Sequence, residues 1–349
     1  MKKNYYYFID LLRWFAAMGI LLHHYAAHFK VNEINNSDFF NYFIKNNIIG
    51  SYGVWLFWCI SGFIFTSIYV NNKDTIVQFS IKRFARLYPL HFVTLIIVAI
   101  LQYYSLKEFN HFQINDQNNF FRFILNLFFI NDENSFNSVI WSVSIEIPVY
   151  FIFFFYLRLI NNNILIKTII LVIILWFVLR SGFLYYHLSA CLFYFFFGVL
   201  IYLLCNLVKK FNFYLLIAST AGIIITPLMF EIKNSLFFSE YRNYIPTTLF
   251  LFFVLLTLFF SLEKYLHKFG EKIKFLGDSS YAIYLIHFPI QVFILILNDL
   301  KIINIELFSS YKYLIIFFII INYLSYLVFK LFEYPARKGL LIFLHKKLI

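Results

Sequence analysis

Apolar side chains gather in runs along the whole chain, and short polar segments separate these runs. An α-helix needs about 20 predominantly apolar residues to cross the hydrocarbon core of a bilayer. Ten runs come close to this length, approximately 6–28, 49–70, 87–104, 139–160, 164–180, 188–205, 213–230, 245–262, 279–298 and 312–332. An eleventh run, 120–130, is too short to span and is expected to be interfacial or re-entrant. The pattern predicts an all-α fold, a polytopic membrane helix bundle of about ten transmembrane helices.

Composition supports the membrane class. Of the 349 residues, 62% are hydrophobic and only 13% are charged, whereas a soluble domain averages about 25% charged residues. A soluble protein of this size could not cover so much apolar surface. No segment reads as a separate soluble domain, so residues 1–349 are interpreted as one integral membrane domain.

Basic residues give the expected orientation. With a cytoplasmic N-terminus, the segments on the inner side hold nineteen Lys and Arg, those on the outer side hold nine, and Arg13 lies within the first run. Cytoplasmic loops of membrane proteins carry such an excess. We therefore expect both termini in the cytoplasm, in a multi-pass protein of the cell inner (plasma) membrane. The same rule accounts for the net charge of +12, so a nucleic-acid partner is not indicated.

The first run carries charge where charge is costly. Asp10, Arg13, His23 and His24 interrupt it, and each Asp or Arg costs roughly 2.5–3.5 kcal/mol on insertion scales. At 100° per residue, Arg13 and His24 share one helical face, and Asp10 lies one turn before Arg13. The alternative interpretation is a structural Asp–Arg pair with an interfacial histidine.

Two arginines precede the third run. Arg83 and Arg86 lie three residues apart, with Lys82 beside them. Two guanidinium groups on one helical face suit a phosphate. Taken alone, the cluster is better explained by the positive-inside rule.

The fourth run begins with WSVSIE, which contains Trp141, Ser142, Ser144 and Glu146. Glu146 is expected at the outer depth of His24, where a carboxylate could orient a histidine. An intramembrane Glu is a functional candidate by default, and a structural interhelical hydrogen bond is the alternative.

The ninth run contains a histidine about midway across the membrane. His287 follows Ser280, Tyr281 and Tyr284. It could contribute to a site or simply form a hydrogen bond between helices. Across the whole sequence, the candidate residues show no Ser–His–Asp order and no spacing typical of a metal-ligand cluster.

Six segments in order resemble the acyltransferase-3 family of integral membrane acyltransferases. They are IDLLRWFAAMGILLHHY with Arg13 and His24, GVWLFWCISGFIF at 53–65, the Arg83/Arg86 pair, WSVSIE at 141–146, LGDSSYAIYLIHFPI at 276–290 and FEYPARK at 332–338. Any one segment is a weak signal, but six in family order are a strong one. Two departures stand out. Trp55 occupies a position that is often acidic in the family. The sequence ends soon after its last apolar run, so we expect a stand-alone member without the C-terminal SGNH hydrolase-like domain that some members carry.

The resemblance implies a membrane O-acyltransferase that takes an acyl group, typically acetyl, from cytosolic acyl-CoA. The acceptor implied is a hydroxyl of a surface or secreted glycan, or of a lipid-linked saccharide. His24 would be the general base, with Glu146 orienting it and Arg13 contacting the donor.

The other site residues follow from the same resemblance. Coenzyme phosphates would bind Arg83, Arg86 and Lys82, with no metal required. Candidates for contacting substrate are Asp10, Trp141, Ser142, Ser144, Tyr281, Tyr284 and His287. Direct transfer and an acyl-histidine intermediate both remain open, as do the identities of the acceptor and the acyl group.

Two other function classes fit parts of the pattern. A transporter or flippase of a glycan or lipid-linked intermediate would also use intramembrane Arg, Glu and His, although no inverted repeat is evident. A non-catalytic sensor or scaffold would not explain polar residues at matching depths. Neighbouring genes would separate the acyltransferase from the transporter, since genes for glycosyltransferases favour the enzyme and a gene for an ATPase partner favours the transporter.

The charge asymmetry predicts where each end of the chain reacts. Single cysteines placed at Lys2, Lys209 and Lys347 should be labelled only by reagents that reach the cytoplasm. Impermeant maleimide on intact cells checks this, with the same cells permeabilised as the control. Strong labelling of position 347 from outside would reject the ten-helix arrangement with both termini in the cytoplasm.

Overall fold

The computed structural model describes residues 5–29, 48–130, 136–160, 162–235 and 245–347, and its regular elements in these ranges are all helical. The predicted all-α class is therefore confirmed. Lys2, Lys3 and residues 131–135, between the short run at 120–130 and the fourth spanning run, lie outside the described residues.

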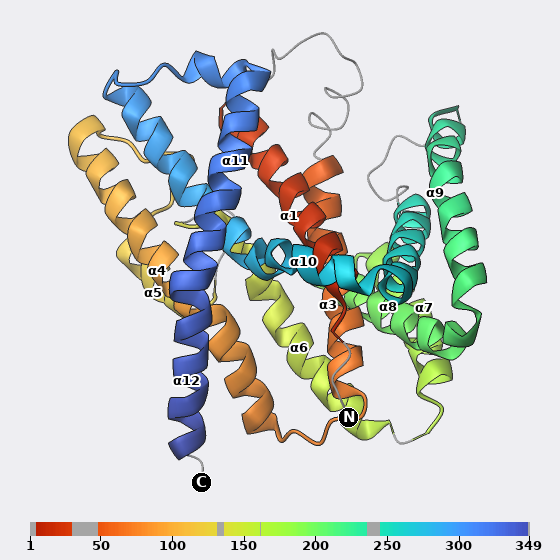
Figure 1. Ribbon diagram of the computed structural model, residues 1–349. Helices are drawn as coiled ribbons and strands as arrows, with labels where there is room; N and C mark the ends of the chain where they lie inside the picture. The colour runs from red at the N-terminus through yellow and green to blue at the C-terminus, as the bar shows by residue number, and fades with distance from the viewer. Residues whose placement is uncertain (1–4, 30–47, 131–135, 161, 236–244, 348–349) are drawn as a thin grey trace. The chain divides into compact units, whose positions relative to one another are not determined.

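Each apolar run predicted from the sequence corresponds to a helix or to part of one (Figure 1). The α-helices are α1 (Tyr7–His28), α3 (Ile48–Tyr69), α4 (Ile76–Phe109), α5 (Phe120–Leu127), α6 (Trp141–Leu159), α7 (Ile164–Ser181), α8 (Tyr186–Val208), α9 (Asn212–Ser235), α10 (Ile245–Asp299), α11 (Tyr311–Val328) and α12 (Tyr334–Lys347). A 3₁₀ turn, η1 (Ser138–Ile140), precedes α6, and a π-helical turn (Phe329–Glu333) joins α11 to α12. The short run at 120–130 is α5, whose eight residues cannot span a bilayer.

Seven helical stretches in the described residues are long and apolar enough to cross a membrane. They are Ile49–Tyr69, Ile76–Phe109, Ser138–Leu159, Ile164–Ser181, Tyr186–Thr226, Pro246–Asp299 and Tyr311–Leu344. α1 is not among them, because its polar side chains lower its mean hydropathy. Two predicted runs, 245–262 and 279–298, belong to α10, which has non-helical backbone angles at Leu266. The count of ten spans and the cytoplasmic termini stay predictions.

α4 begins well before the apolar run that predicted it. Thr75 caps the helix, since its side chain accepts from the Gln78 N–H while the Gln78 side chain accepts from the Thr75 N–H. This capping box satisfies two backbone donors that a helix start otherwise leaves unpaired. Arg83 and Arg86 consequently lie inside a regular helix, three positions apart on one face.

The chain forms two compact units, and several helices contribute to both. The first unit comprises Met1–Ala16, Val54–Lys73 and Pro148–Gly277, and the second comprises Ala17–Gly53, Asp74–Ile147 and Asp278–Ile349.

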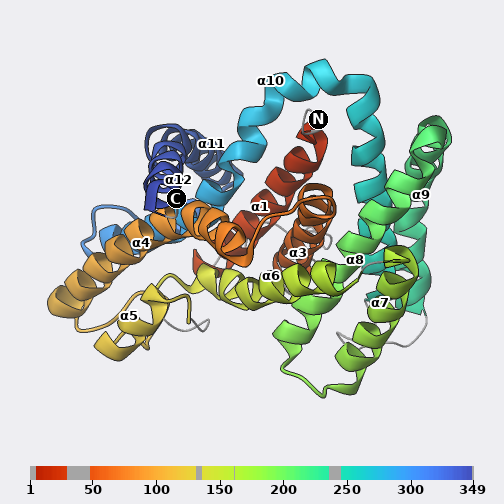
Figure 2. The ribbon, with the colours of Figure 1, turned by 90° about the horizontal axis from the view of Figure 1, so that it is seen from below.

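In the first unit, α3 and α8 approach so closely that only glycine fits between them. A Cβ atom on Gly62 would lie 1.9 Å from the Phe195 carbonyl oxygen, and one on Gly198 would lie 1.9 Å from the Cys59 carbonyl oxygen. Small residues allow this approach of backbones in membrane helix packing. In the same unit Trp55, at the position often acidic in the family, stacks on Tyr194 with ring centroids 5.0 Å apart. α7 packs beside α8 (Figure 2).

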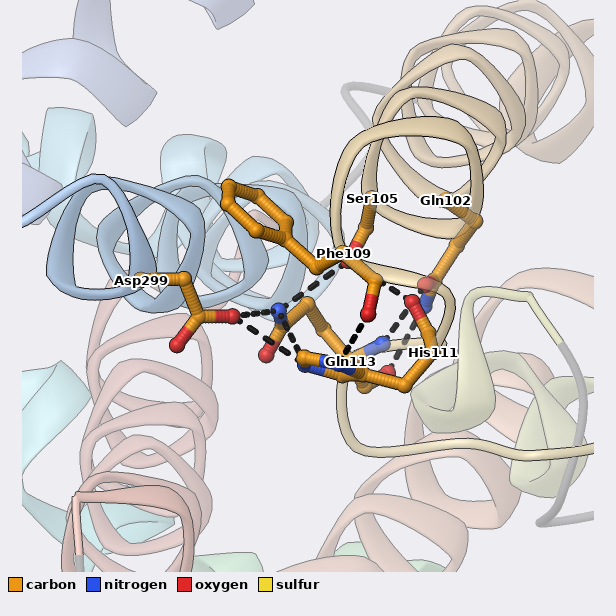
Figure 3. Close-up of polar contacts among 6 residues, drawn as sticks. All are labelled: Gln102, Ser105, Phe109, His111, Gln113 and Asp299. Carbon is orange, nitrogen blue, oxygen red and sulfur yellow. Dashed lines mark hydrogen bonds and ion pairs between the residues drawn. The ribbon is translucent and has the colours of Figure 1, made fainter.

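In the second unit, α4 packs along α12 (Figure 1), and a polar cluster ties the end of α4 to the end of α10 (Figure 3). Gln102 exchanges two hydrogen bonds with the Gln113 backbone, and the Gln113 side chain donates to Asp299 at 2.5 Å. His111 Nε2 also contacts Asp299, at 3.1 Å. These bonds hold the segment that follows α4 against the ends of α4 and α10.

The glycine contact predicts a sharp steric effect. Gly62→Ala should lower the free energy of unfolding by about 1–3 kcal/mol or more, because the backbone carbonyl it meets cannot rotate away. Thermal melting of the purified protein in detergent measures this. Gly339→Ala is the matched control, since its Cβ would meet no atom within 4 Å; it should melt at or slightly above the wild-type temperature. Equal melting of the two variants would contradict the proposed packing.

Candidate functional site

Histidines of α1 and α10 meet in the second unit. The Nδ1 atom of His24 lies 2.8 Å from the Nε2 atom of His287, and the two rings are nearly parallel with centroids 5.1 Å apart. His287 is fully buried, whereas His24 is partly exposed. The sequence predicted both as candidates, and the tertiary structure brings them into direct contact.

A second pair extends this contact by one helical turn. His28 stacks on His24 with centroids 5.4 Å apart and an angle of 4° between the rings. Its Nδ1 atom lies 2.8 Å from Oε1 of the buried Gln291. We call His24, His28, His287 and Gln291 the histidine cluster. No group of three His, Cys, Asp or Glu side chains in the described part of the chain is arranged to hold a metal ion.

Two members of this cluster, His28 and Gln291, were not predicted from the sequence, although their spacing carries a signal. His28 follows His24 by four positions, and Gln291 follows His287 by four. Residues at this spacing are neighbours on a helix surface, so two facing helices with such pairs can make two parallel contacts.

Tyr284, one turn before His287 on α10, fixes the start of α6. Its hydroxyl donates to the Val139 carbonyl, and the Ser142 hydroxyl lies 2.6 Å from the Tyr284 oxygen. Because the tyrosine proton is already used, Ser142 is the donor in the second bond. Ser144 instead bonds to the Ile140 carbonyl in its own helix. Trp141, the first residue of α6, is partly exposed.

Asn137 lies just before this segment and satisfies a carbonyl that proline leaves unpaired. Pro289 has no N–H, so it cannot bond to the Leu285 carbonyl four residues earlier. The Asn137 side chain donates to that carbonyl at 3.3 Å, and Asn137 is fully buried. Backbone groups freed by proline in membrane helices need such substitutes.

Tyr281, a further turn toward the start of α10, bonds to α4. Its hydroxyl donates to the Leu87 carbonyl at 2.8 Å. The Arg86 guanidinium lies over the Tyr281 ring, 5.5 Å from its centroid, and pairs with Glu333 in the π-helical turn. Glu333 is 1% exposed and Arg86 is 17% exposed. Glu146 is buried, and it is close enough to Tyr281 to interact with it electrostatically.

Two of the three cations predicted to bind phosphate, Arg86 and Lys82, are thus already engaged in ion pairs. Glu333 engages Arg86, and Asp74 pairs with Lys82 at 2.5 Å. Glu333 was not predicted as a site residue, although it lies within the FEYPARK segment that resembles the family. Its position in a π-helical turn is notable, because such turns often occur at functional sites.

The first unit holds the remaining predicted pair. Arg13 Nη1 lies 2.7 Å from the Asp10 carboxylate, three positions earlier on α1. Asp10 is also in close contact with Gly277, where a Cβ atom would lie 2.5 Å from the Asp10 Cβ. The Asp10–Arg13 pair, which the sequence offered as a structural alternative, is therefore present.

Comparisons with known proteins agree with the resemblance found in the sequence. The acyltransferase-3 family model, described as an acyltransferase domain, matches residues 6–335. The acyltransferase MdmB of Streptomyces mycarofaciens is 32% identical over 99 residues, which are 28% of this chain and 24% of that protein. The chain thus matches about a quarter of that relative's length. No solved structure matches the chain. The family match includes α1, the start of α4, the start of α6, the second half of α10 and Glu333, so the chain belongs to the acyltransferase-3 family of membrane acyltransferases.

Proposed function

We propose that this acyltransferase moves an acyl group, acetyl in the simplest case, from cytosolic acyl-CoA to a hydroxyl of a surface or secreted glycan. The acceptor could be carried on a lipid, and the protein would act in the plasma membrane. The observation that carries the proposal is the contact between His24 and the buried His287. It holds an imidazole in a fixed position on a partly exposed helix end, as a general base requires.

In this proposal the reaction is a direct transfer. The acceptor hydroxyl oxygen bonds to the thioester carbonyl carbon while His24 takes the hydroxyl proton. The carbon–sulfur bond then breaks, and the proton passes from His24 to the departing coenzyme sulfur. The products are an ester and free coenzyme A, so atoms and charge balance without a further reactant.

Other side chains would bind the two substrates. Arg83 and Arg86 would hold coenzyme phosphates, with Arg86 kept in place by Glu333 and Tyr281. Lys82 would add positive charge nearby, and Arg13, on the same helix as His24, would contact the donor. Glu146 would supply negative charge near the transfer site.

The remaining candidates would contact the substrates. Trp141, Ser142, Ser144, Tyr281, Tyr284 and Asp10 are proposed to shape the approach of the substrates. Of these, Ser142 and Tyr284 bond to each other next to His287 on α10.

Changing His24 tests the base assignment. His24→Ala should lower the transfer rate by about 10²–10⁴-fold, the usual contribution of a general base, while the protein still inserts and binds acyl-CoA. His23→Ala is the matched control and should be milder, because adjacent residues point about 100° apart. Glu146→Gln should fall between them, since it removes charge and keeps shape. Thiol release by purified protein with a sugar acceptor is the measurement, and a wild-type rate for His24→Ala would reject the assignment.

A test of the donor site must separate effects on acyl-CoA binding from effects on the stability of the fold. Arg83→Ala should weaken acyl-CoA binding by roughly 1.5–3 kcal/mol, the contribution of one charge-assisted contact. Arg86→Ala alone should also destabilise the fold by about 3–5 kcal/mol, because it leaves the Glu333 carboxylate buried and unpaired. Adding Glu333→Gln should recover much of that stability and leave donor binding weak.

Lysine substitution refines this test. Arg86→Lys should restore donor binding incompletely if the contact is bidentate. Isothermal titration with coenzyme A and thermal melting on the same samples give the two readouts. Wild-type donor affinity in the variant that combines Arg83→Ala, Arg86→Ala and Glu333→Gln would show that the phosphates bind elsewhere.

A further inference from the structure

His287 makes a second hydrogen bond that determines where its own proton lies. The Nδ1 atom of His287 is 2.9 Å from the Ile283 carbonyl oxygen, one turn earlier on α10. A carbonyl oxygen can only accept a hydrogen bond, so Nδ1 of His287 must carry a proton. In a neutral imidazole the other nitrogen, Nε2, is then an acceptor.

That acceptor faces His24. Because Nε2 of His287 lies 2.8 Å from Nδ1 of His24, His24 must donate through Nδ1. The proton of neutral His24 is therefore on Nδ1, and its Nε2 atom carries the free lone pair. A backbone carbonyl on α10 thus selects, through one buried ring, which nitrogen of His24 can take a proton.

We propose that His287 is a positioning residue that fixes the tautomer of His24, so that Nε2 of His24 is the base in acyl transfer. This inference rests on the proposed function of His24. It assigns His287 a role through another residue rather than direct substrate contact.

The same chain of bonds responds when His24 becomes protonated. While His24 holds the acceptor's proton, its imidazolium donates from Nδ1 to the neutral His287, and the Ile283 carbonyl dipole orients that ring. In a buried setting a hydrogen bond from a charged donor is roughly twice as strong as a neutral one. Such a bond is therefore stronger in the transition state than in the ground state, which is the condition for accelerating the reaction.

The neighbouring histidine is excluded from this role by its own partner. Nδ1 of His28 lies 2.8 Å from the amide oxygen of Gln291. That oxygen accepts, so His28 also carries its proton on Nδ1, and it stacks on His24 without an in-line bond between their nitrogens. His28 would limit rotation of the His24 ring, while His287 sets its proton.

Three substitutions at position 287 separate the two bonds. His287→Gln places an amide near the position of Nε2, where its oxygen can still accept from His24. His287→Asn places an amide near Nδ1, where it can reach Ile283 but not His24. His287→Leu removes both bonds and keeps a similar volume. His91→Asn is the control for disturbing a buried histidine elsewhere, because His91 is equally buried and its Nε2 atom contacts the Asn126 carbonyl at 2.8 Å, a bond that the variant loses.

The first readout is the tautomer itself. The full-length protein, labelled with ¹⁵N-histidine and held in lipid nanodiscs, gives imidazole nitrogen spectra, and subtraction of the His24→Ala spectrum assigns His24. We expect His24 to be protonated on Nδ1 in the wild type, in His287→Gln and in His91→Asn. In His287→Asn and His287→Leu it should become a mixture of the two tautomers. Protonation of wild-type His24 on Nε2 would overturn the proposal.

The second readout is turnover with acyl-CoA and a sugar acceptor. In His287→Asn and His287→Leu, kcat should fall by about 10²-fold, the lower end of a general base's contribution, with KM for acyl-CoA unchanged. His287→Gln should retain most of the rate. Equal losses in His287→Gln and His287→Asn, with His24→Ala inactive, would overturn the positioning role and leave the base assignment intact. Wild-type turnover in His24→Ala would instead overturn the proposed function and this inference together.

Discussion

Hydrocarbon supplies no water, so a polar side chain within a membrane helix must find its hydrogen-bond partner in the protein. The second half of α10 shows how this protein meets that constraint. Tyr281, Tyr284, His287 and Gln291 occupy about 120° of its surface and bond in turn to α4, to the start of α6 and to two positions on α1. One polar stripe therefore holds three other helices of the second unit.

The bonds along this stripe depend on one another. Pro289 removes a backbone donor near the C-terminal end of α10, and the Asn137 side chain replaces it at the Leu285 carbonyl. That bond fixes the segment before α6, whose Val139 carbonyl then accepts from Tyr284. Because each group is buried or nearly so, loss of one partner would leave another unsatisfied, at a cost of about 1–3 kcal/mol. Such a network favours one arrangement of the helices over sliding alternatives.

The same contacts serve the proposed chemistry. A general base must be held in one orientation and, while neutral, in one tautomer, and the network around His287 can supply both. At the other end of the stripe, Tyr281 and Glu333 orient Arg86, which suits a cation that must meet a phosphate without rearranging. In this proposal the same side chains have a structural and a catalytic role, whereas from the sequence these two roles were weighed as alternatives.

The sequence by itself determined the helical elements and the family. An apolar run of spanning length predicts a helix directly, because a helix satisfies all its backbone hydrogen bonds within its own segment in lipid. Spacing along one helix was equally readable. It predicted the shared face of Arg83 and Arg86, and it offered the Asp10–Arg13 pair, which is present, as a structural alternative. It also contained the four-residue spacings of His24 with His28 and of His287 with Gln291.

Only the tertiary structure decided which helices meet. His24 and His287 are 263 positions apart, and Arg86 and Glu333 are 247 apart, so helical periodicity cannot pair them. Glu146 was expected beside His24, yet the partner of His24 Nδ1 is a second histidine. A different carboxylate, that of Glu333, pairs with Arg86. The direction of the proton between His24 and His287 depends on the Ile283 carbonyl, a backbone atom that every residue possesses. Sequence names the side chains, but a proton's position follows from which acceptor each ring faces, and only the packed helices decide that.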